Sequence, residues 1–289
     1  MILTRYRWST TPEAIDVMTG SGTQGGTVLM AKGSTILKSI GSSALDLIYP
    51  PALYCICCGK IIDESRPYRL CNDCMDGMKW IGDRLCSKCG KILAPSNPSG
   101  MCFSCREHPH NYDKGYTCTE YGTHERAIVF ALKYDGRADI AVSIGEILAD
   151  RMLAEFDAGE LAAMYDIVLP VPVHPKKKSR RGYNQAALIG EEFAKRVGLT
   201  CDDYILVRAR ETHIMRSLGP DQRRENIRGA FSIRPAEILR IAGKSVLLVD
   251  DIYTTGATID EIARVLKDAG ASRVDFLSFA SGADMVKSI

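Results

Sequence analysis

The chain has 289 residues, of which 46% are hydrophobic and 25% are charged, and its formal net charge is +2 at pH 7. This length allows two domains or one large domain with an appendage, and the apolar fraction suffices for a buried core. The small net charge argues against a protein that binds polyanions over its whole surface, and no apolar run approaches the ~18 residues of a membrane span.

The first part of the chain is expected to contain little structure. Residues 1–34 are rich in Ser, Thr and Gly and lack periodicity, so we expect them to be disordered. They also lack the apolar centre of a signal peptide, which predicts a cytoplasmic protein without membrane insertion. Between Ile36 and Ile48 apolar residues recur at helical spacing, until Pro50 and Pro51 end the predicted helix.

Residues 55–105 contain an internal repeat built around cysteines. The pattern C-x2-C-x12-C-x2-C occurs twice, 31 residues apart, and Gly59 and Lys60 of the first copy match Gly90 and Lys91 of the second. Disulfides are rare in the cytoplasm, and four C-x2-C pairs in register would be a poor redox design. Four thiolates at this spacing close a tetrahedral site, so the repeat predicts two structural Zn2+ ions in two zinc ribbons. The predicted zinc ligands are Cys55, Cys58, Cys71, Cys74, Cys86, Cys89, Cys102 and Cys105.

The spacing does not decide how these cysteines share the two ions. Equal internal loops favour one ion per copy, but a cross-braced arrangement, in which alternate pairs share an ion, stays open. Cys57, Cys118 and Cys201 fall outside the register and are expected to be ordinary buried or free thiols. His108 and His110 are interpreted as linker residues, because the cysteine sets are already complete.

Residues 111–289 are expected to form an α/β domain with a parallel sheet and flanking helices, preceded by a helix and zinc module over 35–110. The cations of segment 132–137 either lie at a solvated helix end or face a ligand. Strands are predicted over 116–121, 166–173, 204–207 and 230–233, and helices over 125–134, 140–156 and 184–198.

A cationic segment follows the predicted strand 166–173. Residues 176–181 carry five cations in six positions, which repel one another unless they are solvated or bind an anion. Such a run is usually a wet surface loop, but this one lies at the carboxyl end of a strand, where open parallel sheets bind ligands. The anion interpretation predicts a loop that holds pyrophosphate. Its candidate contacts are Lys176, Lys177, Arg180 and Arg181.

A second polar segment, residues 208–228, contains six arginines together with Gly219 and Pro220. It is interpreted as a mobile loop that closes over a charged ligand and excludes water. For residues 221–228 alone, a surface helix of mixed charge is an equally good interpretation.

The most informative stretch is residues 245–258. Val246–Val249 predicts a strand buried on both faces of a sheet; Asp250 and Asp251 follow, and a turn then leads into a helix. A turn at a helix N-terminus suits a phosphate monoester, and the carboxylates suit the hydroxyls of a ribose. A response-regulator receiver would carry such acids near its start, and a Walker B strand would need a P-loop. A purely structural turn is disfavoured, since adjacent carboxylates at a buried edge are costly.

Residues 249–258, Val-Asp-Asp-Ile-Tyr-Thr-Thr-Gly-Ala-Thr, resemble the phosphoribosyl-pyrophosphate (PRPP) motif of type I phosphoribosyltransferases. With the double zinc ribbon and segments 132–137, 180–185 and 223–231, the order of parts is similar to the ComF family of competence-associated proteins. This resemblance covers residues 45–280. It implies a type I phosphoribosyltransferase fold and, in competent bacteria, a role in the uptake or handling of single-stranded DNA.

The resemblance also implies how PRPP binds. The ribose would lie on Asp250 and Asp251, and Mg2+ would bridge ligand oxygens with few direct protein ligands. Purine salvage enzymes carry an Asp base where this chain has Thr254, which disfavours that reaction. Met215 stands where the family often has Gln, so the contact of that Gln is not carried over. The expected phosphate-binding residues are Thr254, Thr255, Gly256, Ala257 and Thr258.

Two functions stay open from the sequence. In the first, the chain is an enzyme that transfers phosphoribose to an amine or nucleobase. In the second, PRPP or a nucleotide is bound without turnover, and the ribbons hold single-stranded DNA or a protein of the competence machinery. Tyr54, Tyr68, Trp80 and Phe103 could stack on bases, although core packing is their plainer use. The cations considered for this surface are Lys60, Arg66, Arg69, Lys79, Arg84, Lys88 and Lys91.

Overall fold

A computed structural model of the chain describes residues 53–211 and 220–284. The expected disordered segment 1–34 and the helix predicted from Ile36 lie outside the described residues. Most of the predicted loop before Pro220, including Met215, lies outside them as well.

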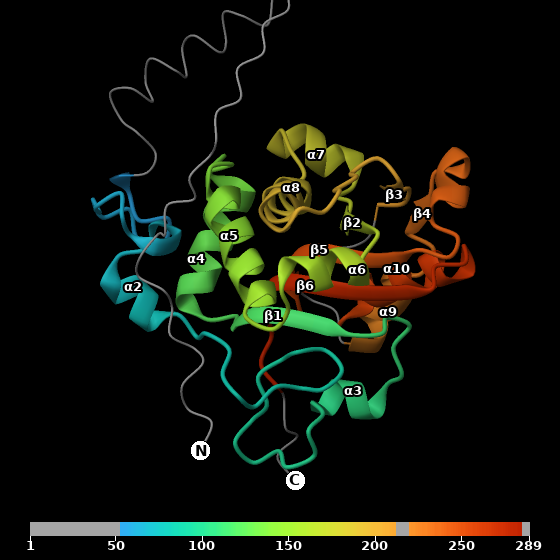
Figure 1. The fold of residues 1–289 in the computed structure, drawn as a ribbon, viewed down its shortest axis with the longest axis horizontal. Coiled ribbons are helices and arrows are strands. Elements are labelled where there is room, and N and C mark those ends of the chain that lie inside the picture. The colour runs from blue at the N-terminus through green and yellow to red at the C-terminus, as the bar shows by residue number, and fades with distance from the viewer. Residues whose placement is uncertain (1–52, 212–219, 285–289) are drawn as a thin grey trace, which may run out of the picture.

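A four-stranded parallel sheet forms the centre of the fold (Figure 1). The strand order is β1-β6-β5-β2, and Leu248 of β5 lies opposite Phe276 of β6. Val246–Val249 are completely buried, because β5 is covered on both faces and paired on both edges. The predicted parallel sheet is therefore confirmed. The strands are β1 Gly115–Glu120, β2 Ile167–Pro170, β5 Ser245–Tyr253 and β6 Arg273–Ser281.

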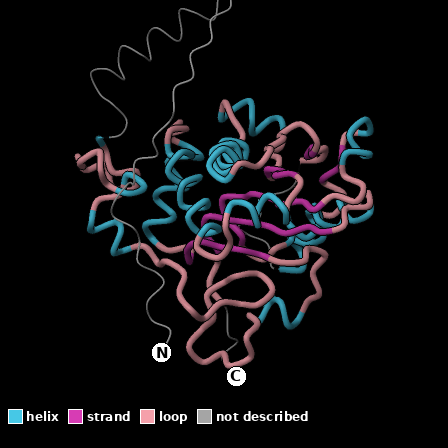
Figure 2. The backbone as a smooth tube through the Cα atoms, viewed as in Figure 1, coloured by secondary structure: helices cyan, strands magenta, loops and turns pink. Residues whose placement is uncertain are grey.

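Helices cover both faces of this sheet. On one face, α4, α5 and α8 pack on Leu247, Val249 and Leu277. On the other face, α10 packs on Val246 and Leu248. Figure 2 shows the same helices and strands by colour along a backbone tube. The bounds are α4 Thr123–Tyr134, α5 Ile140–Leu153, α6 Ala158–Met164, α7 Pro175–Arg181, α8 Gln185–Val197, α9 Pro220–Ile227, α10 Ala257–Asp268 and the 3-10 helix η4 Pro235–Arg240.

The cationic segment 176–181 was predicted as a loop, and this prediction is wrong. It forms helix α7, in which Pro175 occupies the first turn and the His174 side chain accepts a hydrogen bond from the Lys176 amide. Gly182, with φ of 89°, ends the helix in a left-handed conformation. The capping signals of the flanking residues therefore outweigh the repulsion among the lysines and arginines.

Of three further predictions, the structure adjusts two and confirms one. The strand predicted over 204–207 is β3 (Leu206–Arg208), which pairs antiparallel with β4 (Phe231–Ile233) in a separate two-stranded sheet. The surface-helix interpretation of residues 221–228 is confirmed by α9. Helix α5 ends at Leu153, three residues before the predicted end.

The two cysteine modules dock at different places on the α/β domain. In Figure 1 the first, with η2 (Pro67–Arg69) and α2 (Asn72–Gly77), lies beside α4, and the second, with α3 (Phe103–Glu107), lies below β1. The Tyr68 hydroxyl donates to Asp150 of α5 at 2.6 Å. The Phe103 amide donates to Asp284, just beyond β6, at 2.9 Å. Each module is therefore tied to the sheet domain by polar contacts.

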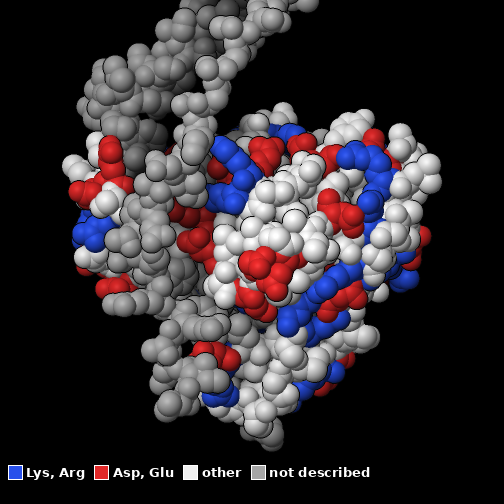
Figure 3. All heavy atoms as spheres, in the orientation of Figure 1, with Lys and Arg blue, Asp and Glu red and all other residues white. Residues whose placement is uncertain are grey.

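The surface is of mixed charge. Figure 3 shows acidic and basic side chains interspersed over the face in view, as the small net charge predicts. Among the described residues, no helix combines the length and the apolar character that crossing a membrane requires.

Candidate functional site

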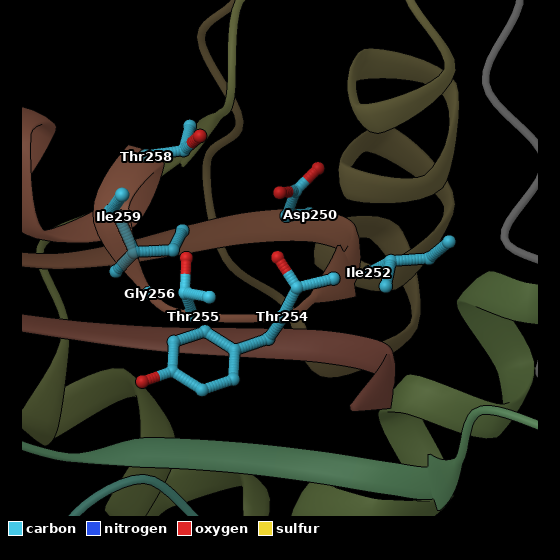
Figure 4. Close-up of a pocket in the computed structure, with 9 residues that line it drawn as sticks. Asp250, Ile252, Thr254, Thr255, Gly256, Thr258 and Ile259 are labelled. Carbon is cyan, nitrogen blue, oxygen red and sulfur yellow. The ribbon is translucent and has the colours of Figure 1, made fainter. Parts of the chain in front are cut away.

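A hollow lies where β5 ends and α10 begins, at the carboxyl edge of the sheet (Figure 4). The amides of the first turn of α10 have no helical acceptor, and the helix dipole places partial positive charge there. In Figure 4 the Asp250 carboxylate and the hydroxyls of Thr254 and Thr258 face the same side of this turn. The hollow is lined by Asp250, Ile252, Tyr253, Thr254, Thr255, Gly256, Ala257, Thr258 and Ile259.

Gly256 gives the turn its shape. Its φ is 81°, which residues with a side chain rarely adopt. A Cβ at this position would lie 2.6 Å from the Tyr253 hydroxyl, so the turn rests directly on the Tyr253 ring. Only glycine combines this backbone conformation with so close an approach. The five residues predicted to bind phosphate all line the hollow.

The two adjacent carboxyl groups interact with each other but have different further partners. Asp250 lines the hollow. Asp251 is 3% exposed and forms an ion pair with Lys133 of α4, and Gln185 of α8 donates to it at 3.4 Å. The expectation that both carboxylates contact one ligand stays a prediction.

The two carboxylates also differ in their electrostatics. Burial, and then the neighbouring Asp251 charge, raise the pKa of Asp250 well above its usual value. Burial also acts to raise the pKa of Asp251, but the Lys133 charge and hydrogen bonds outweigh it, so that pKa is lowered. The Asp251 amide donates to Asp250 at 2.9 Å. The pKa values of the two carboxyl groups are therefore shifted in opposite directions.

The cations of α7 lie near this edge but do not line the hollow. Lys176 pairs with Glu211 at 2.7 Å, and both side chains are largely exposed. Partial desolvation, and then the charges of Arg208 and Arg181, lower the pKa of Lys177. Arg208 of β3 in turn interacts electrostatically with Asp250. Lys177 and Arg208 thus link α7 to the Asp250 side of the site, whereas Arg180 is simply exposed.

The eight predicted zinc ligands form two separate sets of four, one per repeat copy. A tetrahedral zinc with Zn–S bonds of about 2.3 Å separates its sulfurs by about 3.8 Å. The Cys58 and Cys71 sulfurs lie 3.7 Å apart, and those of Cys89 and Cys102 lie 3.6 Å apart. The residues therefore fit two structural zinc ions with sequential ligation, and the cross-braced alternative is excluded.

The remaining cysteines have different surroundings. Cys118 is buried, which raises the pKa of its thiol to about 12. The side-chain ligand atoms of Cys57, Cys74 and His124 lie within 4.8 Å of one another, a proximity that the register of the repeat did not predict. His108 and His110 belong to no cysteine cluster among the described residues, as expected of linker residues.

Two family matches divide the chain as its motifs do. Residues 44–106 match the double zinc ribbon domain family, and residues 213–287 match the phosphoribosyl transferase domain family.

Three curated relatives are similar to about half of the chain. DNA utilization protein YhgH of Salmonella typhi is 31% identical over 51% of this chain and 63% of its own length. Competence protein F of Haemophilus influenzae is 31% identical over 40% of this chain and 50% of its own length. Competence protein ComFC of Streptococcus pneumoniae is 32% identical over 46% of this chain and 57% of its own length.

The chain is ComF-like. The predicted resemblance to the ComF family, with a zinc ribbon module and a phosphoribosyltransferase-like domain, is thereby confirmed. The matches span between half and two thirds of these relatives' lengths.

Several residues of the ComF-like site were not predicted from the sequence. Lys133 was noted only as one of two cations with an open role, and Gln185 as the start of a helix. Arg208 belonged to the expected mobile loop. Lys91, which donates to the Thr254 carbonyl at 2.6 Å, was noted only as a repeated position and as one of the candidate DNA-binding cations. These contacts join residues far apart in the chain, so no local pattern indicates them.

Proposed function

We propose that this ComF-like chain binds PRPP with Mg2+ in the hollow between β5 and α10. The observation that carries the proposal is that Asp250 and the Thr-Thr-Gly-Ala-Thr turn line the same hollow. A carboxylate that accepts hydroxyl hydrogen bonds and a helix N-terminus that binds phosphate are the two groups that a ribose 5-phosphate needs. Their separation by a short turn keeps the phosphate away from the carboxylate charge.

The ligand would lie with its 5′-phosphate on the amides and hydroxyls of residues 254–258. Its ribose hydroxyls would contact Asp250, while Asp251 with Lys133 and Gln185 would hold the Asp250 backbone in place. Mg2+ prefers octahedral oxygen ligation and would take most of its ligands from PRPP and water. The pyrophosphate group would face Lys177 and Arg208, with the other α7 cations, Lys176, Arg180 and Arg181, around it.

The residues of the hollow account for the binding of PRPP more fully than for the transfer of its phosphoribosyl group. Transfer of phosphoribose leaves positive charge at C1 of the ribose, and cations beside the leaving group would stabilise the departing pyrophosphate. A neutral hydroxyl, Thr254, stands where a purine-specific base would be needed, and it accepts no proton at pH 7. A bound phosphoribosyl ligand that serves DNA utilization in the cytoplasm is therefore the function that we propose.

The zinc ribbons are assigned a structural role in this proposal. All seven of their candidate DNA-binding cations have contacts within the chain; Lys60 pairs with Asp73 and Lys79 with Glu120. Arg69 pairs with Asp139, and Lys88 donates to the Tyr112 carbonyl. Such contacts reduce the charge that the ribbons present to a polyanion. Contact with single-stranded DNA or a competence protein stays a prediction, tested by the salt dependence of binding.

Calorimetric titration of the zinc-loaded protein with PRPP tests the proposal, with and without Mg2+. We expect saturable, magnesium-dependent binding that is weakened about tenfold in Asp250→Asn, since an acceptor for the ribose hydroxyls is replaced by an amide group. Asp268→Asn, an exposed acid near the end of α10, is the matched control. Absence of magnesium-dependent binding in the wild-type chain would contradict the proposal. Pyrophosphate release on addition of amines or nucleobases would extend it to an enzyme.

A further inference from the structure

The internal repeat places two lysines at equivalent positions, but only one of them contacts the turn of residues 254–258, which we call the phosphate turn. Lys60 of the first copy is exposed, with 64% of its side chain accessible, and pairs with the equally exposed Asp73. Lys91 of the second copy is 5% exposed. Its ammonium donates to the Thr254 carbonyl at 2.6 Å and lies 5.2 Å from the centre of the Tyr253 ring.

Lys91 belongs to the metal-binding knuckle of the second ribbon. The Cys86 amide donates to the Lys91 carbonyl at 2.8 Å, so the ligand pair and the lysine share one tight turn. A Cβ on Gly90 would lie 2.6 Å from the Gly115 carbonyl, which shows that this knuckle presses against β1. The equivalent Gly59 has nothing within 4 Å of such an atom. The two copies share a sequence pattern but not a neighbour.

A second contact joins the same zinc site to the turn. The Tyr112 hydroxyl lies 2.8 Å from the Tyr253 hydroxyl and 3.8 Å from the sulfur of the zinc ligand Cys105. Tyr253 supports Gly256 from below, as described above. The path from zinc ligand to phosphate turn therefore runs through two buried tyrosines, in parallel with Lys91.

The charges explain why a lysine can be buried here. An ammonium group removed from water needs a compensating negative charge or strong acceptors. One Zn2+ and four thiolates carry a net charge of about −2, and Lys91 follows the ligand Cys89 by two residues. Zinc bound by these four cysteines would therefore fix the shape of the knuckle, and the excess negative charge of the thiolates would help to compensate the Lys91 ammonium.

We propose that the second zinc knuckle positions the phosphate-binding turn through Lys91, so that the phosphate affinity depends on this zinc site and not on the first. Lys91 is a positioning residue in this proposal, since it contacts the backbone of the turn and does not line the hollow. The part that concerns phosphate affinity rests on the PRPP site proposed above; the part that concerns the order of the turn does not.

The repeat supplies the matched pair of variants for the test, Lys91→Met and Lys60→Met. In both, zinc content is measured first, and two ions per chain show that the ribbons have kept their metals. Hydrogen exchange of residues 253–258 then reports the order of the turn, and calorimetry with PRPP and Mg2+ reports its affinity. Tyr112→Phe, which retains the ring and removes the hydroxyl contact, is the second variant.

We expect amide exchange in the turn to be at least about tenfold faster in Lys91→Met, and PRPP binding about tenfold weaker, which corresponds to about 1.4 kcal/mol. Lys60→Met should match the wild type in both measurements, and Tyr112→Phe should show a smaller effect of the same sign. Equal exchange in Lys91→Met and Lys60→Met would overturn the inference. If the wild type bound no PRPP, the proposed function would fail, while the exchange data would still decide the inference.

Discussion

Asp250 and Asp251 show how neighbouring residues of one type acquire different chemistry. Both follow the same apolar strand, yet one lines the hollow and the other pairs with Lys133 in the interior. Their surroundings differ, because Lys133 of α4 forms an ion pair with Asp251 and Gln185 of α8 donates to it. Their pKa values are therefore shifted in opposite directions.

The raised pKa of Asp250 predicts a particular pH dependence of stability. A group whose pKa is higher in the folded state stabilises the fold below its unfolded pKa, and this contribution is lost as the pH rises through the folded pKa. We therefore expect the stability of the wild type relative to Asp250→Asn to fall with increasing pH, with a slope of at most about 1.4 kcal/mol per pH unit. Urea unfolding between about pH 4 and pH 8 at constant free zinc measures it, because the decline begins at the unfolded pKa of about 3.9. A pH-independent difference would contradict the assigned shift.

Gly256 carries a second prediction. Gly256→Ala should destabilise the chain by about 1–2 kcal/mol for the left-handed backbone, and by more for the contact with Tyr253. Gly243→Ala is the matched control, because Gly243 has a similar φ of 73° but nothing within 4 Å of a Cβ. Urea unfolding of both variants separates the two costs. Equal destabilisation would show that the Tyr253 contact adds nothing.

Helix α7 shows how local signals compete. Its five cations suggested a solvated loop, yet Pro175 in the first turn, the His174 cap and the left-handed Gly182 define a helix. Two of its lysines find acids on other elements, Lys176 with Glu211 and Lys178 with Asp203. These acids come from residues 203–211, so the two ion pairs could not be inferred from the segment itself.

The two ribbons should differ in how readily they lose zinc. In the first set Cys58 is exposed, whereas all four ligands of the second set are buried. A chelator reaches exposed thiolates first, so we expect two-phase zinc release, with the fast phase from the first ribbon. A colorimetric chelator assay measures the phases, and Cys58→Ser should remove the fast one. Loss of the slow phase in that variant would reverse the assignment.

Buried side chains from both sides of the predicted boundary between residues 110 and 111 pack together. One core cluster joins Ile56, Tyr68 and Leu70 to α5, and the other joins Leu93 to Tyr253 and Phe276. The described parts of the ribbons and of the α/β domain therefore share their cores. We expect them to unfold as one cooperative unit.

Tyr68→Phe tests this cooperativity. It removes the hydroxyl that joins the first ribbon to Asp150 of α5, and we expect the global free energy of unfolding to fall by about 1–2 kcal/mol. Tyr204→Phe, at a position that is 56% exposed, is the control and should have little effect. Calorimetric unfolding with zinc present measures both. A separate ribbon transition, with the main transition unchanged, would show that the two parts fold independently.

The features predicted correctly from the sequence are those with local causes. The cysteine spacing indicated two zinc sites because the ligands of each ion lie within one short turn and loop. The apolar run before Asp250 indicated a buried parallel strand, and the Thr-Gly turn indicated the start of a helix. In each case the residues that determine the structure are neighbours in the chain.

The features that were missed depend on contacts between distant residues. Lys60 and Lys91 are indistinguishable within the repeat, and only the packing of the second ribbon under β5 and β6 gives Lys91 its partner, Thr254, 163 residues later. Whether Asp251 meets a ligand or Lys133 depends on which helix covers that face of the sheet. The local pattern thus indicated the kinds of site that this ComF-like chain could hold. The packing of distant segments decided which residues support those sites, because a charge buried in the interior takes its partner from whatever the fold brings beside it.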